Sequence, residues 1–460
     1  MGRNSNNTEM VKARFGRKRR RNSIVLLLFV IFLIWFFIPR SLSPEVRAQL
    51  AEIRQLNQTP SNAFTYLIGM SAPSGVDPMS YGRELLPQYI ASSDYGVGST
   101  HTAPVSSNLV SVSPLDCSLF KDSDCLELLF TASDARAQTL AKYPDRVARY
   151  EGYKTFTDYH VPYPMNVGSY VPAFTMIIGG QKVYLMQQVE LLERHEITVE
   201  QMQQNVLGDL AYWRTELVDA DSIMYTMTVV RLINNDLNML AKLYQRYGLH
   251  APAIAPLSEA ERTMRLADAF ETSINYAMLN DLRISHQRCG ASHWKACVDR
   301  FIDAIVIDHN ATLNLMSQLR TQQLGLADLS PDQAYLHHDD EPAQIKLTQW
   351  IRNSAGAEMA EMAQKNLSQY VYRVDDLNLK IALLNASASQ PPASQDLTWL
   401  MSIKSPYGST AGHAFIDVDG VGRGWLCLKT TVKEENLPLN GCIPWLRDMR
   451  SQPELAAPQS

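Results

Sequence analysis

The sequence predicts a mainly α-helical protein: a helical bundle or short α-solenoid behind an N-terminal transmembrane anchor, with a small C-terminal β-hairpin module. Three observations support this fold class. An uncharged apolar run lies near the start, apolar residues recur every three or four positions within residues 117–388, and β-branched and aromatic residues surround glycines after residue 396. The chain has 460 residues, 46% of them hydrophobic, which is enough for a sizeable core.

Residues 1–22 form a basic head. They contain eight Lys or Arg and one acid, a net charge of +7, so the overall charge of −5 leaves −12 for the rest of the chain. The motif RKRRR in this head also occurs in nuclear-localisation and nucleic-acid-binding segments. The acidic body, however, predicts no binding of nucleic acid.

A transmembrane anchor is predicted over residues 23–39. Its core, Ile24–Ile38, has no charge and no helix breaker, and it ends in the aromatic sequence WFF, which suits a membrane–water interface. The alternative is the apolar region of a cleaved signal peptide, because the run is short for a membrane span. The positive charge before the run predicts a single-pass inner-membrane protein with a cytoplasmic N-terminus and a periplasmic body.

Residues 40–116 are predicted to contain short helices and a surface loop. Ser43 is a suitable N-cap and Pro44 a suitable first residue for a helix. Residues 92–116 are rich in Ser and Gly and have no apolar period, so they predict the loop.

The helical domain is predicted over residues 117–388. Its start and stop signals are two capping boxes and one glycine: Thr198 with Gln201, Ser258 with Glu261, and Gly248. Its apolar stripes are Val199–Met202–Val206–Leu210–Trp213–Leu217, Val230–Ile233–Leu237–Leu240–Tyr244, Leu266–Phe270–Ile274–Met278, Ile302–Ile305–His309–Thr312–Met316–Leu319 and Leu367–Val371–Val374–Leu377–Ile381–Leu384. At least five amphipathic helices with short connections indicate a bundle or solenoid.

The chain changes character after the last stripe. Residues 389–395, SQPPASQ, indicate a linker, and residues 396–460 a small disulfide-stapled β module with a tail. Asp419 and Gly420 are typical of a hairpin turn, which Cys427 and Cys442 would staple.

The six cysteines fall into three neighbouring pairs that we predict as disulfides: Cys117 with Cys125, Cys289 with Cys297, and Cys427 with Cys442. All of them follow the predicted anchor, and disulfides persist on the oxidising side of a membrane. Each bridge would contribute about 2.5–3 kcal/mol by restricting the unfolded chain.

The segment SHQRCGASHWKAC leaves a second possibility open. Its side chains include two imidazoles and two thiols, a set that is able to surround a zinc ion: His286, Cys289, His293 and Cys297. The spacing of this cysteine pair resembles that of Cys117 and Cys125, where no histidine is close in sequence, so one explanation covers both pairs if they are disulfides.

Ser118 and Lys121 match the S-x-x-K motif of penicillin-recognising serine enzymes, with Ser118 as nucleophile and Lys121 as base. The sequences SIN at 273–275 and KTT at 429–431 follow in the expected order. The expected glycine after KT is missing, the spacings are long, and the helical middle of the chain is unlike that fold. No other catalytic or nucleotide-binding motif occurs, and no cofactor is predicted.

Three further patterns have both a functional and a structural interpretation. His309 beside Asp308 resembles a general base with its orienting acid, or a satisfied core histidine. The run HHDDEP, 337–342, suits a divalent metal or a helix cap. The aromatic cluster Tyr150–Pro164 is able to line a peptide or glycan groove, or to pack as a loop over the bundle.

The segments NAFTYLIGMSAPSGVDP, DLAYWRTELVDADSIMYTMTVVRLINNDLNMLAKL and DLNLKIALLNA resemble a family of uncharacterised proteobacterial proteins with one N-terminal anchor and a helical envelope-facing body. The resemblance extends over residues 60–385 and implies a periplasmic domain on the inner membrane. It implies no activity and assigns no residue a role. We therefore expect a non-enzymatic interaction or scaffold protein with an envelope protein partner; the alternative is an envelope serine hydrolase acting on peptidoglycan or peptides.

Overall fold

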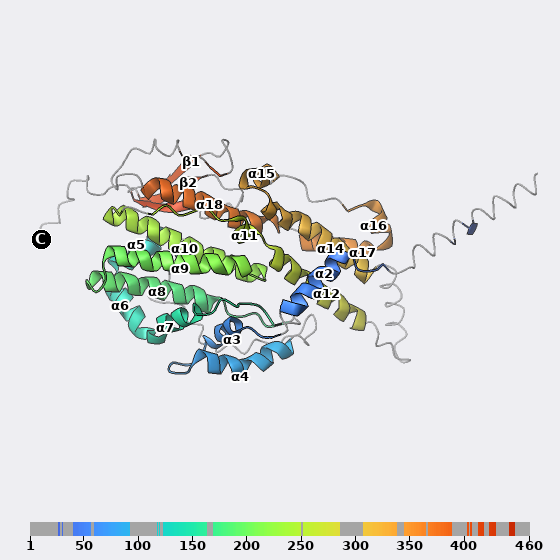
Figure 1. Ribbon diagram of the computed structural model, residues 1–460, viewed down its shortest axis with the longest axis horizontal. Helices are drawn as coiled ribbons and strands as arrows, with labels where there is room; N and C mark the ends of the chain where they lie inside the picture. Colours follow the sequence, from blue (N-terminus) through green and yellow to red (C-terminus); the bar gives the residue numbers. More distant parts are fainter. Residues whose placement is uncertain are drawn as a thin grey trace, which may run out of the picture.

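The computed structural model (Figure 1) describes most of the helical body and part of the C-terminal module. The described residues are 40–56, 59–92, 123–162, 169–249, 252–285, 307–337, 345–364, 367–388, 413–417, 423–428 and 441–446, with single positions at 26, 27, 30, 117, 119, 403, 405 and 406. Among these residues, no helix has the length and apolar character needed to cross a bilayer. The basic head, most of the predicted anchor, almost all of the predicted 92–116 loop and the 389–395 linker lie outside them.

The described chain is mainly helical, as predicted. Its helices are α2 (Pro44–Leu56), α3 (Asn62–Gly69), α4 (Pro78–Ala91), α5 (Ser123–Thr131), α6 (Ser133–Lys142), α7 (Pro144–Tyr153), α8 (Thr175–Glu193), α9 (Val199–Asp219), α10 (Ile223–Tyr247), α11 (Glu259–Arg262), α12 (Arg265–Ser285), α14 (His309–Leu324), the 3-10 helix η2 (Gly325–Asp328), α15 (Pro331–Leu336), α16 (Leu347–Arg352), α17 (Ser354–Gln364) and α18 (Ser368–Ala388).

The predicted helix signals are confirmed. The capping boxes that begin at Thr198 and Ser258 both form at the starts of α9 and α11, and the Ser43 hydroxyl accepts a hydrogen bond from Val46 N in the first turn of α2. Gly248 ends α10 with φ of 64°, a left-handed conformation that glycine adopts without steric cost.

Helices α8, α9, α10 and α18 form the centre of the body, with α10 between α9 and α18 (Figure 1). The predicted apolar stripe of α10 is buried throughout. Its other face is also buried, although it carries polar residues: Asn234, Asn235, Asp236, Asn238 and Lys242. Because α10 has neighbours on both sides, it is a core helix rather than a surface helix with one solvent-facing side.

A second group of helices, α2, α12, α14 and α17, packs around its own apolar cluster. The residues just before α2 are fastened to the start of α14. Asp308 Oδ2 accepts from Arg40 N at 3.3 Å, Asn310 Nδ2 donates to Arg40 O at 2.7 Å, and Asn314 bonds Ser43 N at 2.8 Å. We call these contacts the N-terminal clasp.

The C-terminal module is a three-stranded antiparallel sheet, so it extends the predicted hairpin by one strand. Its strands are β1 (His413–Asp417), β2 (Arg423–Leu428) and β3 (Cys442–Leu446), in the order β1-β2-β3. Cys427 and Cys442 are opposite each other in the register, and their sulfur atoms are bonded. Gln245 Nε2 of α10 donates to Pro444 O, which joins the sheet to the helical centre.

One predicted helix begins later than its stripe indicated. The stripe extended from Ile302 through His309 to Leu319, but α14 begins at His309, because Asp308 is extended (φ −92°, ψ 101°) and its carboxylate accepts from Ala311 N as the N-cap. Ile302 and Ile305 lie outside the described residues.

Candidate functional site

The predicted catalytic and zinc-binding residues are not among those that the structure describes. Ser118 and Lys121 lie outside the described residues, and so do His286, Cys289, His293 and Cys297. Within the described ranges no group of His, Cys, Asp and Glu side chains is arranged to hold a metal ion. The zinc and serine-hydrolase hypotheses therefore remain predictions.

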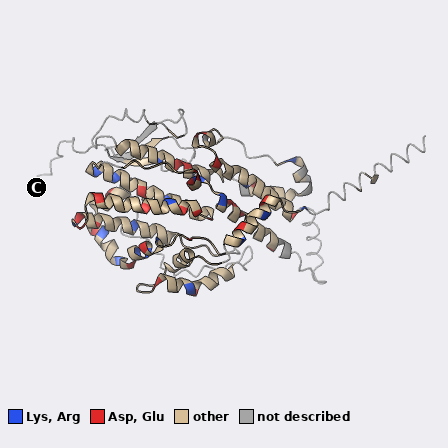
Figure 2. Ribbon diagram, viewed as in Figure 1, with Lys and Arg blue, Asp and Glu red and all other residues tan. Residues whose placement is uncertain are grey.

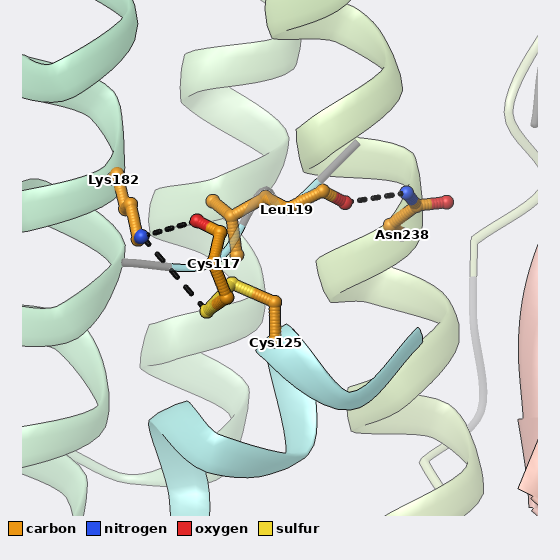
Figure 3. The surroundings of a disulfide bond; sticks show 5 residues. All are labelled: Cys117, Leu119, Cys125, Lys182 and Asn238. Carbon is orange, nitrogen blue, oxygen red and sulfur yellow. Dashed lines mark hydrogen bonds between the residues drawn. A yellow bond between two sulfur atoms is a disulfide. The ribbon is translucent and has the colours of Figure 1, made fainter. Parts of the chain in front are cut away.

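Two of the three predicted disulfides lie in the described part of the chain, and both are formed: Cys117–Cys125 and Cys427–Cys442. Figure 3 shows the first of them between α8 and α10. Lys182 Nζ donates to Cys117 O, and Asn238 Nδ2 donates to Leu119 O at 3.2 Å. Two buried side chains thus hold the backbone on each side of position 118.

Asn238 also accepts a hydrogen bond from a second lysine. Lys380 of α18 is fully buried, and its Nζ lies 2.8 Å from Asn238 Oδ1. Burial lowers the pKa of Lys380 to about 7. An amide oxygen offers a hydrogen bond but no full negative charge, so it does not offset the loss of hydration that disfavours the ammonium form.

The most polar part of the core is a pair of carboxyl groups between α8, α9 and α10, which we call the aspartate pair: Asp209 and Asp236. Asp209 is 1% exposed and Asp236 is fully buried. Gln181 Nε2 of α8 lies 3.2 Å from Asp209 Oδ2 and 3.0 Å from Asp236 Oδ1. Burial, together with the negative Asp209 nearby, raises the pKa of Asp236 well above its ordinary value. The raised pKa favours the protonated form of Asp236, in which it is able to donate a hydrogen bond to Asp209.

The Asp209 carboxylate also accepts hydrogen bonds from two other side chains, which stabilise its charged form. Lys154 Nζ lies 2.7 Å from Asp209 Oδ1, and Tyr150 Oη donates to Asp209 Oδ2 at 2.7 Å. Trp213 Nε1 in turn donates to Tyr150 Oη at 2.7 Å. Burial alone would lower the pKa of Lys154, but Asp209 outweighs it and raises that pKa. The site therefore combines one lysine with two carboxyl groups, of which Asp236 has the raised pKa.

A pocket of about 360 Å³ opens beside this site between α7, α8 and α9. Its lining is mostly polar and includes the side-chain amides of Gln187, Gln188, Gln204 and Asn205. The other lining residues are Val147, Glu151, Lys154, Tyr184, Gly208 and Asp209. The Lys154 ammonium lies 4.5 Å from the centre of the Tyr184 ring and 3.3 Å from Glu151 Oε1. Lys154 and Asp209 thus both line the pocket, whereas Asp236 is fully buried.

This arrangement is suited to holding charge and protons in place. A general acid or base must reach the group whose proton it transfers. Asp236 is fully buried, and the described donors around Asp209 join α7, α8, α9 and α10 to one another. The geometry favours a structural role, with the amide-lined pocket as the part open to small polar molecules.

Glu216 is a further buried acid, in addition to the aspartate pair. Glu216 accepts a hydrogen bond from Tyr225 Oη at 2.5 Å, and Tyr225 and Tyr153 share one at 2.9 Å. Burial raises the pKa of Glu216 to about 7.

The described tyrosines of the aromatic cluster pack in the core and do not line a groove. Tyr150 and Tyr153 are fully buried, and Tyr159 is 4% exposed. Tyr150 and Tyr153 lie in helix α7, not in the loop that the alternative predicted.

The other predicted candidates have structural roles where they are described. Both carboxylate oxygens of Asp308 accept backbone hydrogen bonds, from Ala311 N and Arg40 N, so Asp308 is a helix cap rather than an orienting acid for His309. Of the run at 337–342, only His337 is described. Sequence reasoning missed the aspartate pair because the stripes were traced through apolar residues alone. Asp209 lies three residues after Val206 and Asp236 three residues after Ile233, so both border an apolar stripe.

Comparisons of the chain with protein-family models, with curated proteins and with solved structures give no match. The functional proposal therefore rests on the chain's own residues.

Proposed function

We propose that the protein is a single-pass inner-membrane protein whose helical body lies in the periplasm and binds an envelope protein partner without catalysing a reaction. The observation that carries this proposal is the pairing of Cys117 with Cys125 and of Cys427 with Cys442. Disulfides persist in oxidising compartments. The basic head and the apolar run Ile24–Ile38 supply the matching orientation, with the body outside the cytoplasm.

The state of the buried polar groups supports an interaction role over an enzymatic one. Lys154 is paired with Asp209, Lys182 donates to the Cys117 carbonyl, and Lys380 donates to Asn238. Each of these lysines joins one part of the body to another. The body also carries net negative charge, which favours a protein or small-molecule partner over nucleic acid.

Mass spectrometry of the membrane-extracted protein tests the compartment. We expect all six cysteines to react with an alkylating reagent only after reduction, with peptides that pair 117–125, 289–297 and 427–442. Free alkylation without reduction would contradict a periplasmic body. Reaction of Cys289 and Cys297 only after a chelator is added would instead indicate a metal site.

Crosslinking in intact cells at native expression tests the partner. We expect an envelope protein to co-purify with the full chain after crosslinking, and not with a control protein that has the same anchor and an unrelated body. Recovery of the protein alone would overturn the interaction role.

A serine hydrolase is a second candidate because of one specific observation. Ser118 is flanked in sequence by Cys117 and Leu119, whose carbonyls accept from Lys182 and Asn238, and Asn238 binds Lys380. A lysine with a pKa near 7 is the type of base that activates a serine at neutral pH. Labelling by a fluorescent penicillin that disappears in Ser118→Ala but persists in the conservative Ser118→Cys would favour this candidate. Equal labelling of Ser118→Ala would exclude Ser118 as the nucleophile.

A further inference from the structure

The N-terminal clasp fixes which end of the body meets the membrane, if the proposed anchor is correct. The apolar run ends at Ile38, and Arg40 is already bonded to the start of α14 through Asp308 and Asn310. One residue separates the run from the first fastened residue. A flexible tether between anchor and body is therefore too short to form, and the clasp end of the body lies at the membrane surface.

Helix α16 lies at this same end. Asp308 N donates to Asn353 Oδ1 at 2.8 Å, and Asn353 N bonds Gln349 O in α16 at 3.0 Å. Hydrogen bonds thus lead from Arg40 through Asp308 and Asn353 to α16. Figure 1 shows α16 and α17 together at the end of the body where α2 begins, far from the β-strands.

The composition of α16 is that of an interfacial helix. Its sequence, LTQWIR, contains no acid, and the exposed Lys346 precedes it. Leu347 is 73% exposed. Contact of this apolar side chain with water gives no stabilisation, whereas burial would. Trp350 is half-buried against the apolar cluster of α14 and α17. Leucine, tryptophan and basic residues on one short helix suit the headgroup region of a bilayer.

We propose that α16 is a membrane-contacting helix, with Leu347 inserted among the lipid headgroups and Lys346 beside anionic phosphates; this inference rests on the proposed anchor. The neighbouring α17 presents the exposed acids Glu358 and Glu361, which anionic lipid repels, so the lipid contact is assigned to α16 and not to α17. Figure 2 shows the difference in charge between these two helices.

The molecule contains a matched control for this proposal. Leu336 in α15 is 76% exposed, close to the value for Leu347. Helix α15 packs against η2, which directly follows the far end of α14. Since α14 has 16 residues, the two ends of that helix lie about 24 Å apart. Leu336 is thus an exposed leucine of equal type, placed away from the proposed membrane end.

The experiment uses the full chain in vesicles of phosphatidylethanolamine and phosphatidylglycerol. Leu347→Cys and Leu336→Cys are each labelled with an environment-sensitive fluorophore, and a lipid with a nitroxide near its headgroup serves as quencher. We expect the probe at 347 to emit at shorter wavelength and to lose fluorescence with the nitroxide lipid, and the probe at 336 to do neither. Unchanged thermal unfolding of both variants shows that the substitutions leave the fold intact.

Three outcomes would overturn the proposal, and they differ in what else they affect. If the protein floats with the vesicles but neither probe responds, the anchor stands and α16 does not contact lipid. If both probes respond equally, the body lies on its side, and the orientation is wrong. If the protein does not float with vesicles, the anchor and the proposal built on it both fail.

Discussion

The two sides of helix α10 bury charge in different ways. On the side of α9, Asp236 shares its site with Asp209, and Lys154 supplies a positive charge. On the side of α18, the partner of Lys380 among the described residues is the neutral amide of Asn238. Asp236, Asn238 and Lys380 are all buried to 5% exposure or less. Burial is therefore comparable, and the partner decides the charge state.

The consequence is opposite for the two lysines. The pKa of Lys154 is raised because Asp209 outweighs the cost of burial, whereas the pKa of Lys380 falls to about 7 because nothing offsets that cost. Burial and the neighbouring Asp209 raise the pKa of Asp236, and Lys154, which is bonded to Asp209, offsets only part of that rise. The pKa of a buried lysine thus depends on whether a charged partner lies beside it, and not on the polarity of its surroundings alone.

The largest expected effect comes from removing the positive charge beside the aspartate pair. Lys154→Met leaves the Asp209 carboxylate buried without a positive partner, and we expect a loss of about 3–5 kcal/mol in the free energy of unfolding. Lys380→Met is the matched control, because Lys380 has no carboxylate partner: the lost hydrogen bond costs about 1 kcal/mol, but the variant also removes the cost of burying an amine whose pKa is lowered, so we expect no net loss of stability at neutral pH. Denaturant unfolding of the detergent-solubilised full chain at neutral pH measures both. Equal losses would break the comparison.

The second expected effect is the contribution of Lys380 to the pH dependence of stability. Its pKa is about 7 in the folded state and 10.5 ordinarily, so the unfolded chain binds more protons between these values. The contribution of Lys380 to the stability of the native protein therefore rises with pH in this window, by at most about 1.4 kcal/mol per pH unit. Unfolding at pH 7, 8 and 9 should show the native chain gaining stability relative to Lys380→Met. If the free energies of unfolding of the native chain and of Lys380→Met change with pH in parallel, Lys380 is charged in the folded protein.

A smaller effect tests whether the two sides are interchangeable. Asn238→Asp gives Lys380 the carboxylate that Lys154 already has, so we expect the pH dependence above pH 7 to disappear. The new side chain also loses the donor to Leu119 O, at a cost of about 1 kcal/mol. The same titration of stability measures both terms. A pH dependence equal to that of the native chain would show that the partner does not set the charge of Lys380.

The smallest effect is expected at Asp236. Asp236→Asn replaces the acid with an amide that is still able to donate to Asp209, and it removes the proton uptake that a raised pKa imposes on folding, so we expect no loss of stability at neutral pH. Because the folded pKa of Asp236 is raised, the native chain loses stability as pH rises towards it, and the variant should not. Asp209→Asn is the control, since it leaves Lys154 without its carboxylate. A larger loss for Asp236→Asn than for Asp209→Asn would reverse the assignment of charge.

The sequence predicted local features of this fold better than its core. The capping boxes at Thr198 and Ser258 and the stop at Gly248 were predicted, because they depend on residues within one turn of each other. The cysteine pairs at 117–125 and 427–442 were predicted for the same reason, as neighbours in sequence.

The aspartate pair could not be predicted, because its two residues lie 27 positions apart on different helices. Asp209 and Asp236 each border an apolar stripe, but the periodicity of one helix does not show which residues of another helix they meet. Only the packing of α9 against α10, and of Lys154 after α7 against Asp209, brings the two acids together with their donors. The stripe through His309 failed for a related reason: periodicity does not reveal that Asp308 is extended and begins the helix as an N-cap.

The N-terminal clasp also has a consequence for the timing of folding. Ser43 bonds to Asn314, 271 residues later in the chain, and Gln49 of α2 bonds to Asp268, 219 residues later. A ribosome adds roughly 5–20 residues per second, so α2 is synthesised about 15–50 s before the helix that holds its first turn. Helices α8, α9 and α10 are consecutive in the chain, so each is able to pack against the next soon after its synthesis. The N-terminal helix is thus among the last parts of the body to find its place, and during that interval its apolar face is available to chaperones.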